Sequence, residues 1–471
     1  MDPKGEMLSF DSIVIIMPVI KSKPKALKPT STIVLSFLLV IVVGALLLSM
    51  PFSSKSGEFT NPITCLFTAT SATCVTGLII EDTGAYWSVF GQIVIILMIQ
   101  IGGLGLVTLT SFFSFFIGRK LELRSMQIAS ESVSVDNFSD VKYAVKNIIR
   151  IAFAIEFTGA ILLMFSFVPK YGLQGIYFSF FIAISAFCNA GFDVIGGVET
   201  PFASLMPIND DPIVMLVVPL LIIFGGMGFI VWTDLINFRK TKKLMLQSKI
   251  VLSTTAGLII IGTLLMLICE WNNPNTLGDM EFMGKLRNSF FQSVTFRTAG
   301  FASIDITGMH SITKLVGIFL MFIGVAPGST GGGIKITTFM IVVMTIISVI
   351  KNKSDTIILG HKIEKDAVYK SLSIIVLAGL VAMMTAVITI YSCPQGDISG
   401  IDSAFEAVSA FSTTGLSSGV TAKVGAFARV ILSITMFIGR VGPISFAMSL
   451  TLNREKRKKN EVYPEGKIMV G

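Results

Sequence analysis

The chain has 471 residues, of which 52% are hydrophobic and 14% are charged, and its formal net charge is +8. Soluble proteins carry about 25% charged residues, so this composition excludes a soluble globular protein and indicates an integral membrane protein. The basic residues cluster in short loops and tails beside apolar stretches, which argues against nucleic acid as a partner. Five scattered cysteines show neither metal-ligand spacing nor a disulfide framework.

Eight apolar segments are long enough to cross the hydrocarbon core, which takes about 20 helical residues. They are residues 33–50, 89–117, 148–168, 213–236, 250–268, 315–350, 372–390 and 430–452. Within each successive pair lies a shorter apolar stretch that cannot cross. Such a stretch at membrane depth is typical of a re-entrant helix, sheltered by protein or by a water-filled cavity.

The sequence therefore predicts an all-α integral membrane protein with four tandem repeats of span, re-entrant pore helix and span around one central pore. This amounts to eight transmembrane helices and four pore helices. The predicted units are an N-terminal tail (1–29), repeat 1 (30–120), repeat 2 with a preceding linker (121–238), repeat 3 with a broken second span (239–350), repeat 4 with a preceding linker (351–452) and a C-terminal tail (453–471).

Charge in the loops predicts the orientation. Lys and Arg gather before the first segment and after the second, fourth, sixth and eighth, whereas the alternate loops carry Glu58, Glu81, Asp82, Asp210 and Asp211. By the positive-inside rule, both termini and the linkers are cytoplasmic, and the four short stretches dip in from outside.

Each short stretch ends in the same pattern, with small or polar residues, a glycine and then a large apolar residue. The candidate residues are Val75, Thr76, Gly77; Asn189, Ala190, Gly191; Thr298, Ala299, Gly300; and Thr413, Thr414, Gly415. Rings of backbone carbonyls replace the hydration shell of a cation in selectivity filters, and glycine adopts freely the dihedrals that such turns require. The C-terminal end of a preceding helix is partially negative, which favours cations.

The alternative for each glycine is that it only caps a helix. Four copies in equivalent positions favour a cation filter over four separate caps.

A second glycine cluster follows each turn, at residues 101–105, 224–228, 323–328 and 438–443. This is an internal repeat, and close helix packing is an alternative explanation, favoured for the first two copies. The third copy extends into a Gly-Ser-Thr segment that cannot continue a helix, so we expect a mid-membrane break that acts as a gate, with a simple kink as the alternative. The candidate gate residues are Gly324, Ala326, Pro327, Gly328, Ser329, Thr330, Gly331, Gly332, Gly333 and Lys335.

Charges inside apolar segments are few and normally face a partner or a cavity. Arg440, in the eighth segment, is expected near the depth of the gate segment. It is either a positive charge that limits permeation and binds loop carbonyls, or a structural clamp, and both roles can hold. Arg297 and Glu406 are expected to anchor the filter. No nucleophile or HExxH pattern is present, so the sequence does not indicate an enzyme, and the P-loop pattern is absent.

These motifs resemble the Trk/Ktr/HKT superfamily of potassium-translocating membrane subunits. The resemblance is carried by residues 75–78, 188–192, 297–301 and 412–416, by the glycine-rich break and by Gly439 with Arg440, and it runs from about residue 28 to residue 454. No extra helix pair precedes the first repeat, so the chain looks most like the Ktr-type (KtrB-like) subunit.

The resemblance implies potassium uptake across the bacterial plasma membrane, often enhanced by sodium, by a homodimer on a cytosolic ring of nucleotide-binding (RCK/KTN-type) regulatory proteins. The four glycines would line the potassium filter, and the broken span would be the gating loop. In plant relatives a serine at the first glycine goes with sodium preference, and here Gly77 keeps the glycine. Cys74 and Cys188 precede their glycines by three residues, and at the first of these positions a hydroxyl residue is more usual. Three alternatives remain: a secondary transporter of a small solute, a sodium-selective cation pore and a membrane scaffold.

Overall fold

The computed structural model describes residues 29–105, 138–393 and 398–450, and within these ranges the chain is largely helical. The predicted terminal tails and the loop that joins the first two repeats therefore lie mostly outside the described residues. Two short strands, β1 (Ile357–Ile358) and β2 (His361–Lys362), pair as an antiparallel hairpin.

The helices fall into four successive groups along the chain. The first quarter of the chain contains α1 (Pro29–Ser49), η1 (Pro51–Ser53), α2 (Pro62–Cys74), α3 (Thr83–Tyr86) and α4 (Val89–Leu104). The second contains α7 (Phe138–Tyr171), α8 (Gln174–Phe187), η2 (Ile195–Gly197), η3 (Met206–Ile208), α9 (Pro212–Gly226) and α10 (Phe229–Thr241). The third contains α11 (Leu246–Glu270), α12 (Phe282–Thr295), α13 (Ser311–Phe322) and α14 (Ile336–Ile350). The fourth contains α15 (Lys365–Tyr391), α16 (Gly400–Ser412), α17 (Val420–Lys423), α18 (Ala426–Val441) and α19 (Pro443–Leu450).

The first helix of each quarter is long and apolar enough to cross a membrane. These stretches are Ser31–Ser49, Val145–Tyr171, Leu246–Glu270 and Lys365–Tyr391. Large apolar side chains on them point outward, among them Leu39, Phe165, Ile268 and Val387, each more than 60% exposed. An exposed apolar surface of this kind is stable in lipid and unfavourable in water, so these helices define a multi-pass membrane protein.

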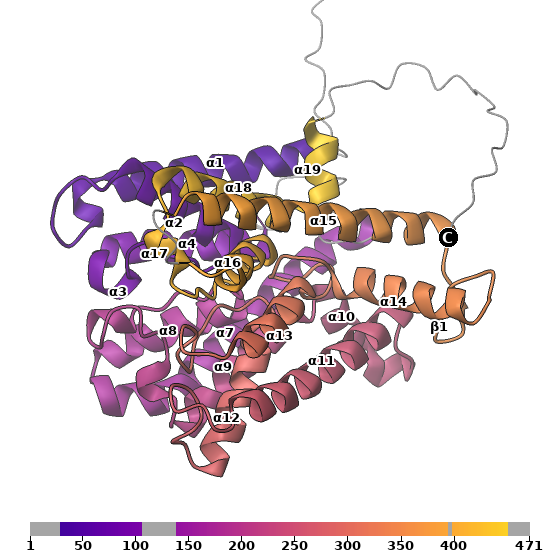
Figure 1. Cartoon of the computed structure of the whole chain (residues 1–471), viewed down its shortest axis with the longest axis horizontal. Coiled ribbons are helices and arrows are strands. Elements are labelled where there is room, and N and C mark those ends of the chain that lie inside the picture. The colour runs from indigo at the N-terminus through magenta and orange to yellow at the C-terminus, as the bar shows by residue number, and fades with distance from the viewer. Residues whose placement is uncertain (1–28, 106–137, 394–397, 451–471) are drawn as a thin grey trace, which may run out of the picture.

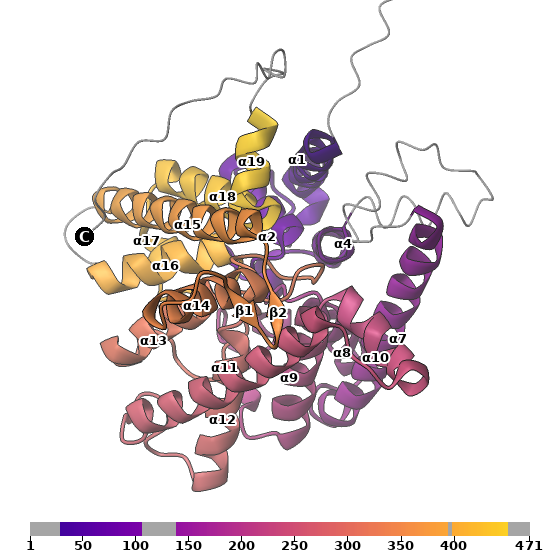
Figure 2. The same ribbon diagram turned by 90° about the vertical axis from the view of Figure 1, so that its right-hand side faces the viewer.

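The four quarters surround a common centre in chain order (Figure 2). Adjacent quarters touch through α4 and α8, through α9 and α12, and through α13 and α16, and the contact of α18 with α2 closes the circle. In Figure 1, α1, α18 and α15 run side by side across the upper part of the molecule, with α19 turned across their end.

Local sequence explains where the short helices α2 and α16 begin. The Asn61 side chain accepts a hydrogen bond from the backbone N–H of Ile63, and Pro62 occupies the first helical position. Ser399 caps α16 by accepting from the N–H of Asp402. Such caps satisfy donors that a helix start leaves unpaired.

The predicted segments 213–236 and 430–452 are not continuous helices. The first is split into α9 and α10, which meet at 95°. The second is split at Gly442, which has φ of 92°, and Pro443 starts α19. The predicted segment 89–117 likewise stops being helical at Leu104, and its remainder lies beyond the described residues.

Hydrogen bonding gives the reason for the break between α9 and α10. The carbonyls of Gly225 and Gly226 accept from Thr330 and Ala326, and the N–H of Phe229 donates to Gly328. The helix ends because these groups bond to another segment. That segment is the predicted interruption in repeat 3, and it is confirmed as non-helical between α13 and α14.

The glycine clusters also pack closely, as the alternative explanation predicted. A Cβ added at Gly102, Gly225 or Gly439 would lie closer than 3.0 Å to the carbonyl oxygen of Thr73, Phe187 or Phe411, respectively. All three carbonyls lie near the C-terminal ends of the short helices. Glycine thus lets the second helix of these quarters lie directly against the short helix.

We expect Gly439→Ala to destabilise the folded protein by about 1–3 kcal/mol, because the backbone of α16 would have to move. Gly379→Ala in α15 is the matched control, since nothing lies within 4 Å of its added Cβ, and it should be neutral or stabilising. Thermal unfolding in detergent, followed by intrinsic fluorescence, tests the pair. Equal unfolding temperatures for the two variants would contradict the packing role of Gly439.

Candidate functional site: a ring of four backbone turns

The four predicted turns share one backbone conformation. The residue two positions before each glycine is left-handed, with φ of 58° at Val75, 59° at Asn189, 63° at Thr298 and 53° at Thr413. The glycines Gly77, Gly191, Gly300 and Gly415 also have positive φ, from 70° to 98°. A left-handed valine or threonine is strained by about 1–3 kcal/mol and persists only where the surroundings impose it. The same strained backbone conformation therefore occurs in all four turns and is imposed by the surrounding structure.

The turns meet in a closed ring. A Cβ added at each glycine would lie closer than 3.0 Å to the carbonyl oxygen just before the glycine of the next turn. The pairs are Gly77 with Ala190, Gly191 with Ala299, Gly300 with Thr414, and Gly415 with Thr76. The predicted residues of all four repeats thus come together, in chain order, with four backbone carbonyls packed against four glycines.

The helix-capping alternative does not fit these glycines. The helices end at Cys74, Phe187, Thr295 and Ser412, between three and five positions before each glycine. Instead, serines in the last helical turn of α2 and α16 bond to two of the glycines. Ser71 Oγ accepts from Gly77 N at 3.0 Å, and Ser409 Oγ accepts from Gly415 N at 3.1 Å.

The glycine-rich segment of repeat 3, residues 323–335, lies against the inner side of these turns. Thr330 Oγ1 donates to Asn189 Oδ1 at 3.0 Å and to the Phe187 carbonyl at 3.2 Å. Gly332 N donates to Thr413 Oγ1 at 3.0 Å, and a Cβ on Gly331 would strike Thr298. The segment thereby contacts the turns of repeats 2, 3 and 4.

Two cations hold this segment in place. Arg440 donates through Nη1 to the carbonyl of Thr330, and through Nη2 to the carbonyls of Gly102 and Gly103. Lys335 Nζ donates to the Gly331 carbonyl at 2.8 Å. The predicted contact of Arg440 with loop carbonyls is present, and the same side chain also clamps the end of α4.

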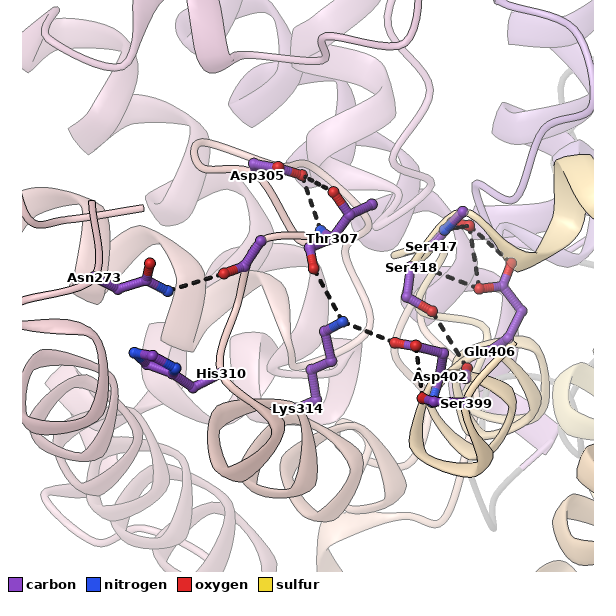
Figure 3. Close-up of polar contacts among 12 residues, drawn as sticks. Asn273, Asp305, Thr307, His310, Lys314, Ser399, Asp402, Glu406, Ser417 and Ser418 are labelled. Atoms are coloured by element: carbon purple, nitrogen blue, oxygen red, sulfur yellow. Dashed lines mark hydrogen bonds and ion pairs between the residues drawn. The ribbon is translucent and has the colours of Figure 1, made fainter. Parts of the chain in front are cut away.

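The other side of the ring faces a cavity of about 260 Å³, lined by the four ring glycines and by the residues that follow them, including Asp193, Asp305, Ser417 and Thr421. Its surroundings are tied together by polar contacts (Figure 3). Lys314 Nζ bridges the Thr307 carbonyl at 3.1 Å and the Asp402 carboxylate at 2.8 Å.

Glu406, expected to anchor the ring, is fully buried beneath the fourth turn. Its carboxylate accepts from the hydroxyls of Ser417 and Thr421 and from the backbone N–H groups of Ser418 and Thr421. Arg297 is also buried, and its Nη2 donates to the Gly324 carbonyl over a long distance of 3.4 Å. Glu406 thus joins α16 to the residues that follow the fourth turn, and Arg297 reaches the start of the glycine-rich segment.

Sequence reasoning missed several parts of this site. Nothing local marks Val75 or Thr413 as left-handed. The serines at positions 71 and 409, each six residues before a glycine, were a detectable repeat signal. Asp193, two residues after Gly191, was not singled out, although an acidic residue beside a turn glycine is visible in the sequence.

The apolar helices and the ring of carbonyls define a multi-pass membrane protein. The profile of the TrkH family, described as a cation transport protein, matches residues 17–460. The chain belongs to this family.

Several relatives match over nearly their whole length. The potassium/sodium uptake protein NtpJ of Enterococcus hirae is 38% identical over 449 residues, which cover 95% of this chain and 98% of the relative. The Ktr system potassium uptake protein B of Bacillus subtilis is 36% identical, covering 94% of this chain and 97% of the relative. The crystal structure of the potassium transporter TrkH from Vibrio parahaemolyticus shares the fold, with a TM-score of 0.69 and 16% identity over 92% of this chain and 86% of that one.

We expect Thr330→Val to loosen the glycine-rich segment, because the variant keeps the shape but removes two hydrogen bonds to the second turn. Loss of about 1 kcal/mol should speed amide exchange in residues 327–333 about fivefold. Ser329→Ala is the control, since that hydroxyl bonds only to the nearby Ala326 carbonyl. Hydrogen–deuterium exchange by mass spectrometry measures both, and equal protection in the two variants would contradict the tethering role of Thr330.

Proposed function

We propose that this chain is the ion-translocating subunit of a Trk/Ktr-type potassium uptake system. The single observation that carries the proposal is the closed ring of carbonyls from Thr76, Ala190, Ala299 and Thr414. Oxygens arranged around one axis can replace the hydration shell of a cation. The NtpJ and Ktr relatives are named as potassium/sodium and potassium uptake proteins, which supports potassium as the ion, with sodium as a second candidate.

In this proposal the chain forms one pore from four repeats, with α2, α8, α12 and α16 as the pore helices and eight membrane crossings. The proposed repeats keep the boundaries expected from the sequence. The C-terminal ends of α2, α8, α12 and α16 point their partial negative charge toward the ring, which favours a cation there. The left-handed residues and glycines supply the geometry, and their neighbours supply the oxygens.

The proposed gate is the segment 323–335. It contacts three of the four turns on one side of the ring, so an ion leaving the ring on that side would meet it. Arg440 would restrain the segment, because its guanidinium donates hydrogen bonds to carbonyls of the segment and of α4. Its positive charge would also limit the passage of a cation. Movement of the segment requires these bonds to break.

The Ktr-like resemblance supports a homodimer in the bacterial plasma membrane, with both termini cytoplasmic and a cytosolic ring of nucleotide-binding regulatory subunits. The helix α14 and the β1–β2 hairpin carry Lys351, Lys353, Lys362 and Lys365 on or near them. This basic surface suits an acidic partner or anionic lipid headgroups.

Gly300→Ser is expected to weaken discrimination between potassium and sodium. A Cβ at this position would strike the Thr414 carbonyl and the Gly191 backbone, which widens or tilts the ring. Rubidium uptake into proteoliposomes, competed with potassium and with sodium, measures the change. Gly379→Ser in α15 is the control and should keep the selectivity of the parent.

The assignment of the ring as a potassium filter would be contradicted by two results together. Gly300→Ser would let an uptake-deficient strain grow on limiting potassium as well as the parent does, and sodium would compete with rubidium uptake to the same extent in both proteins. A sodium-selective pore predicts instead that sodium competes more strongly than potassium in the parent protein. A scaffold predicts no rubidium flux at all.

Shortening the segment Pro327–Gly333 should raise the rubidium flux through reconstituted protein, because the obstruction beneath the ring is removed. The flux should rise without a change in the potassium-to-sodium competition ratio, since the ring itself is untouched. Equal flux in the shortened and parent proteins would remove the gate assignment while leaving the proposed filter standing.

A further inference from the structure

A pocket of about 240 Å³ lies away from the ring, at the C-terminal end of α14. The segments that flank the β1–β2 hairpin and the first turns of α15 complete its walls. The helix α14 packs against both β1 and α15, which brings these elements together (Figure 1). One water needs about 10–15 Å³ of such space, so the pocket admits a group considerably larger than a single ion.

The pocket carries positive charge that no acidic group offsets. Lys353 and Lys365 line it, and neither forms an ion pair within the described part of the chain. The acidic lining residue is Asp355, and its Oδ2 is paired with Lys362 Nζ at 2.7 Å. The acidic residues on either side of Lys365 in the sequence do not line the pocket. Two ammonium groups therefore remain for a ligand.

A buried hydroxyl adds a hydrogen-bond donor to the wall. Ser348 lines the pocket and is only 6% exposed, and its hydroxyl bonds to no protein group in the described ranges. By contrast, the hydroxyls of Thr345 and Thr356 bond to each other at 3.1 Å. The last carbonyls of α14 accept from the backbone N–H groups of residues 351–353. A buried polar group without a partner is costly, so the Ser348 hydroxyl favours an acceptor atom in the pocket.

The pocket opens beside a surface that suits acyl chains. Val349 and Tyr369 line it and are more than 60% exposed, and Ile346 and Ile350 on α14 are exposed as well. The helix α15 is one of those long and apolar enough to cross a membrane, and it starts at the pocket. Tyrosine is enriched where the headgroups of a bilayer meet its hydrocarbon core. A ligand here meets cations at one end and apolar side chains at the other, which matches an amphiphile.

We infer that this pocket binds the phosphate headgroup of an anionic phospholipid. The phosphate oxygens accept from Lys353, Lys365 and Ser348, and the acyl chains lie along the exposed apolar side chains of α14. Basic pockets between transmembrane helices on the cytoplasmic side suit such headgroups, and this is the side on which the charge pattern is expected to place these lysines. A soluble phosphate would leave the apolar surface unused, which favours the lipid.

The inference goes beyond the proposed function and does not depend on it. None of the lining residues belongs to the ring or to the segment 323–335. A protein that transports no ion would still bind the lipid.

The test is native mass spectrometry of the full-length protein in detergent, titrated with palmitoyl-oleoyl phosphatidylglycerol or with the phosphatidylcholine of the same chains. The parent should bind phosphatidylglycerol more tightly. Lys353→Gln combined with Lys365→Gln should raise the Kd of the tightest phosphatidylglycerol site roughly ten- to thirtyfold. Lys351→Gln combined with Lys370→Gln is the matched control, since it removes the same charge from exposed positions outside the pocket. The control should change this Kd less than about twofold.

Two further measurements sharpen the result. Ser348→Ala removes the donor without changing the charge, and it should raise the same Kd about two- to fivefold. A photoreactive phosphatidylglycerol needs no variant, and its crosslinks to the parent should fall on residues 345–369. Glycerol 3-phosphate, added as a soluble competitor at the concentration of the lipid, should not displace it.

Equal loss of phosphatidylglycerol binding in the two lysine pairs would show diffuse attraction and overturn the inference. Displacement of the lipid by glycerol 3-phosphate would overturn it as well and assign the pocket to a soluble phosphate. Equal affinity of the parent for the two lipids would leave the lysines to an acidic protein partner. If the Lys353 and Lys365 variant does not fold, crosslinks that fall only outside residues 345–369 decide against the lipid site.

Discussion

The structure depends on four backbone carbonyls packed against four glycines, with no side chain between them. Each glycine occupies the one position where a Cβ would collide with the next turn, so the diameter of the ring follows from the absence of four side chains. Backbone oxygens held this close repel one another and lose water, and such groups are costly in a medium of low polarity. Strain in the left-handed residues before the glycines adds to that cost. A ring with these properties needs support from every side.

The support comes from helix ends. The carbonyls of Thr73, Phe187 and Phe411 pack directly on glycines of the neighbouring helices, which brings α4, α9 and α18 against the bases of the turns. The same helices then stop, because Gly105, Gly228 and Gly442 adopt positive φ with extended ψ. Each glycine cluster thus both packs its helix against the short helix and ends that helix. Without the interruption the carbonyls of Gly225 and Gly226 would stay inside a helix, and the glycine-rich segment would lose its attachment.

The sequence predicted the parts of the site that repeat. Four copies of the turn, their order between apolar segments and the break after Phe322 follow from composition and spacing. The bend between α9 and α10 could not be predicted, because a hydropathy pattern records apolar residues and not the partners of Gly225 and Gly226. Arg440 bonds to Gly102, which is 338 residues away, and only the closure of the circle brings them together. A valine rarely adopts the left-handed conformation, so the backbone preference of Val75 predicts the wrong conformation at this position.

One asymmetry follows from this design. In the described part of the chain, the second and fourth quarters break their second helix briefly at Gly228 and Gly442, whereas the third inserts the whole segment 323–335. If the segment is the proposed gate, one pore axis needs only one obstruction, and one quarter suffices to supply it. In that proposal the segment must remain folded whether or not an ion is near. The guanidinium of Arg440 meets this need by donating to Thr330 and to Gly102 together, which ties the segment to the first quarter and provides a fixed positive charge where, in the proposed pore, a transported cation would otherwise be the only one.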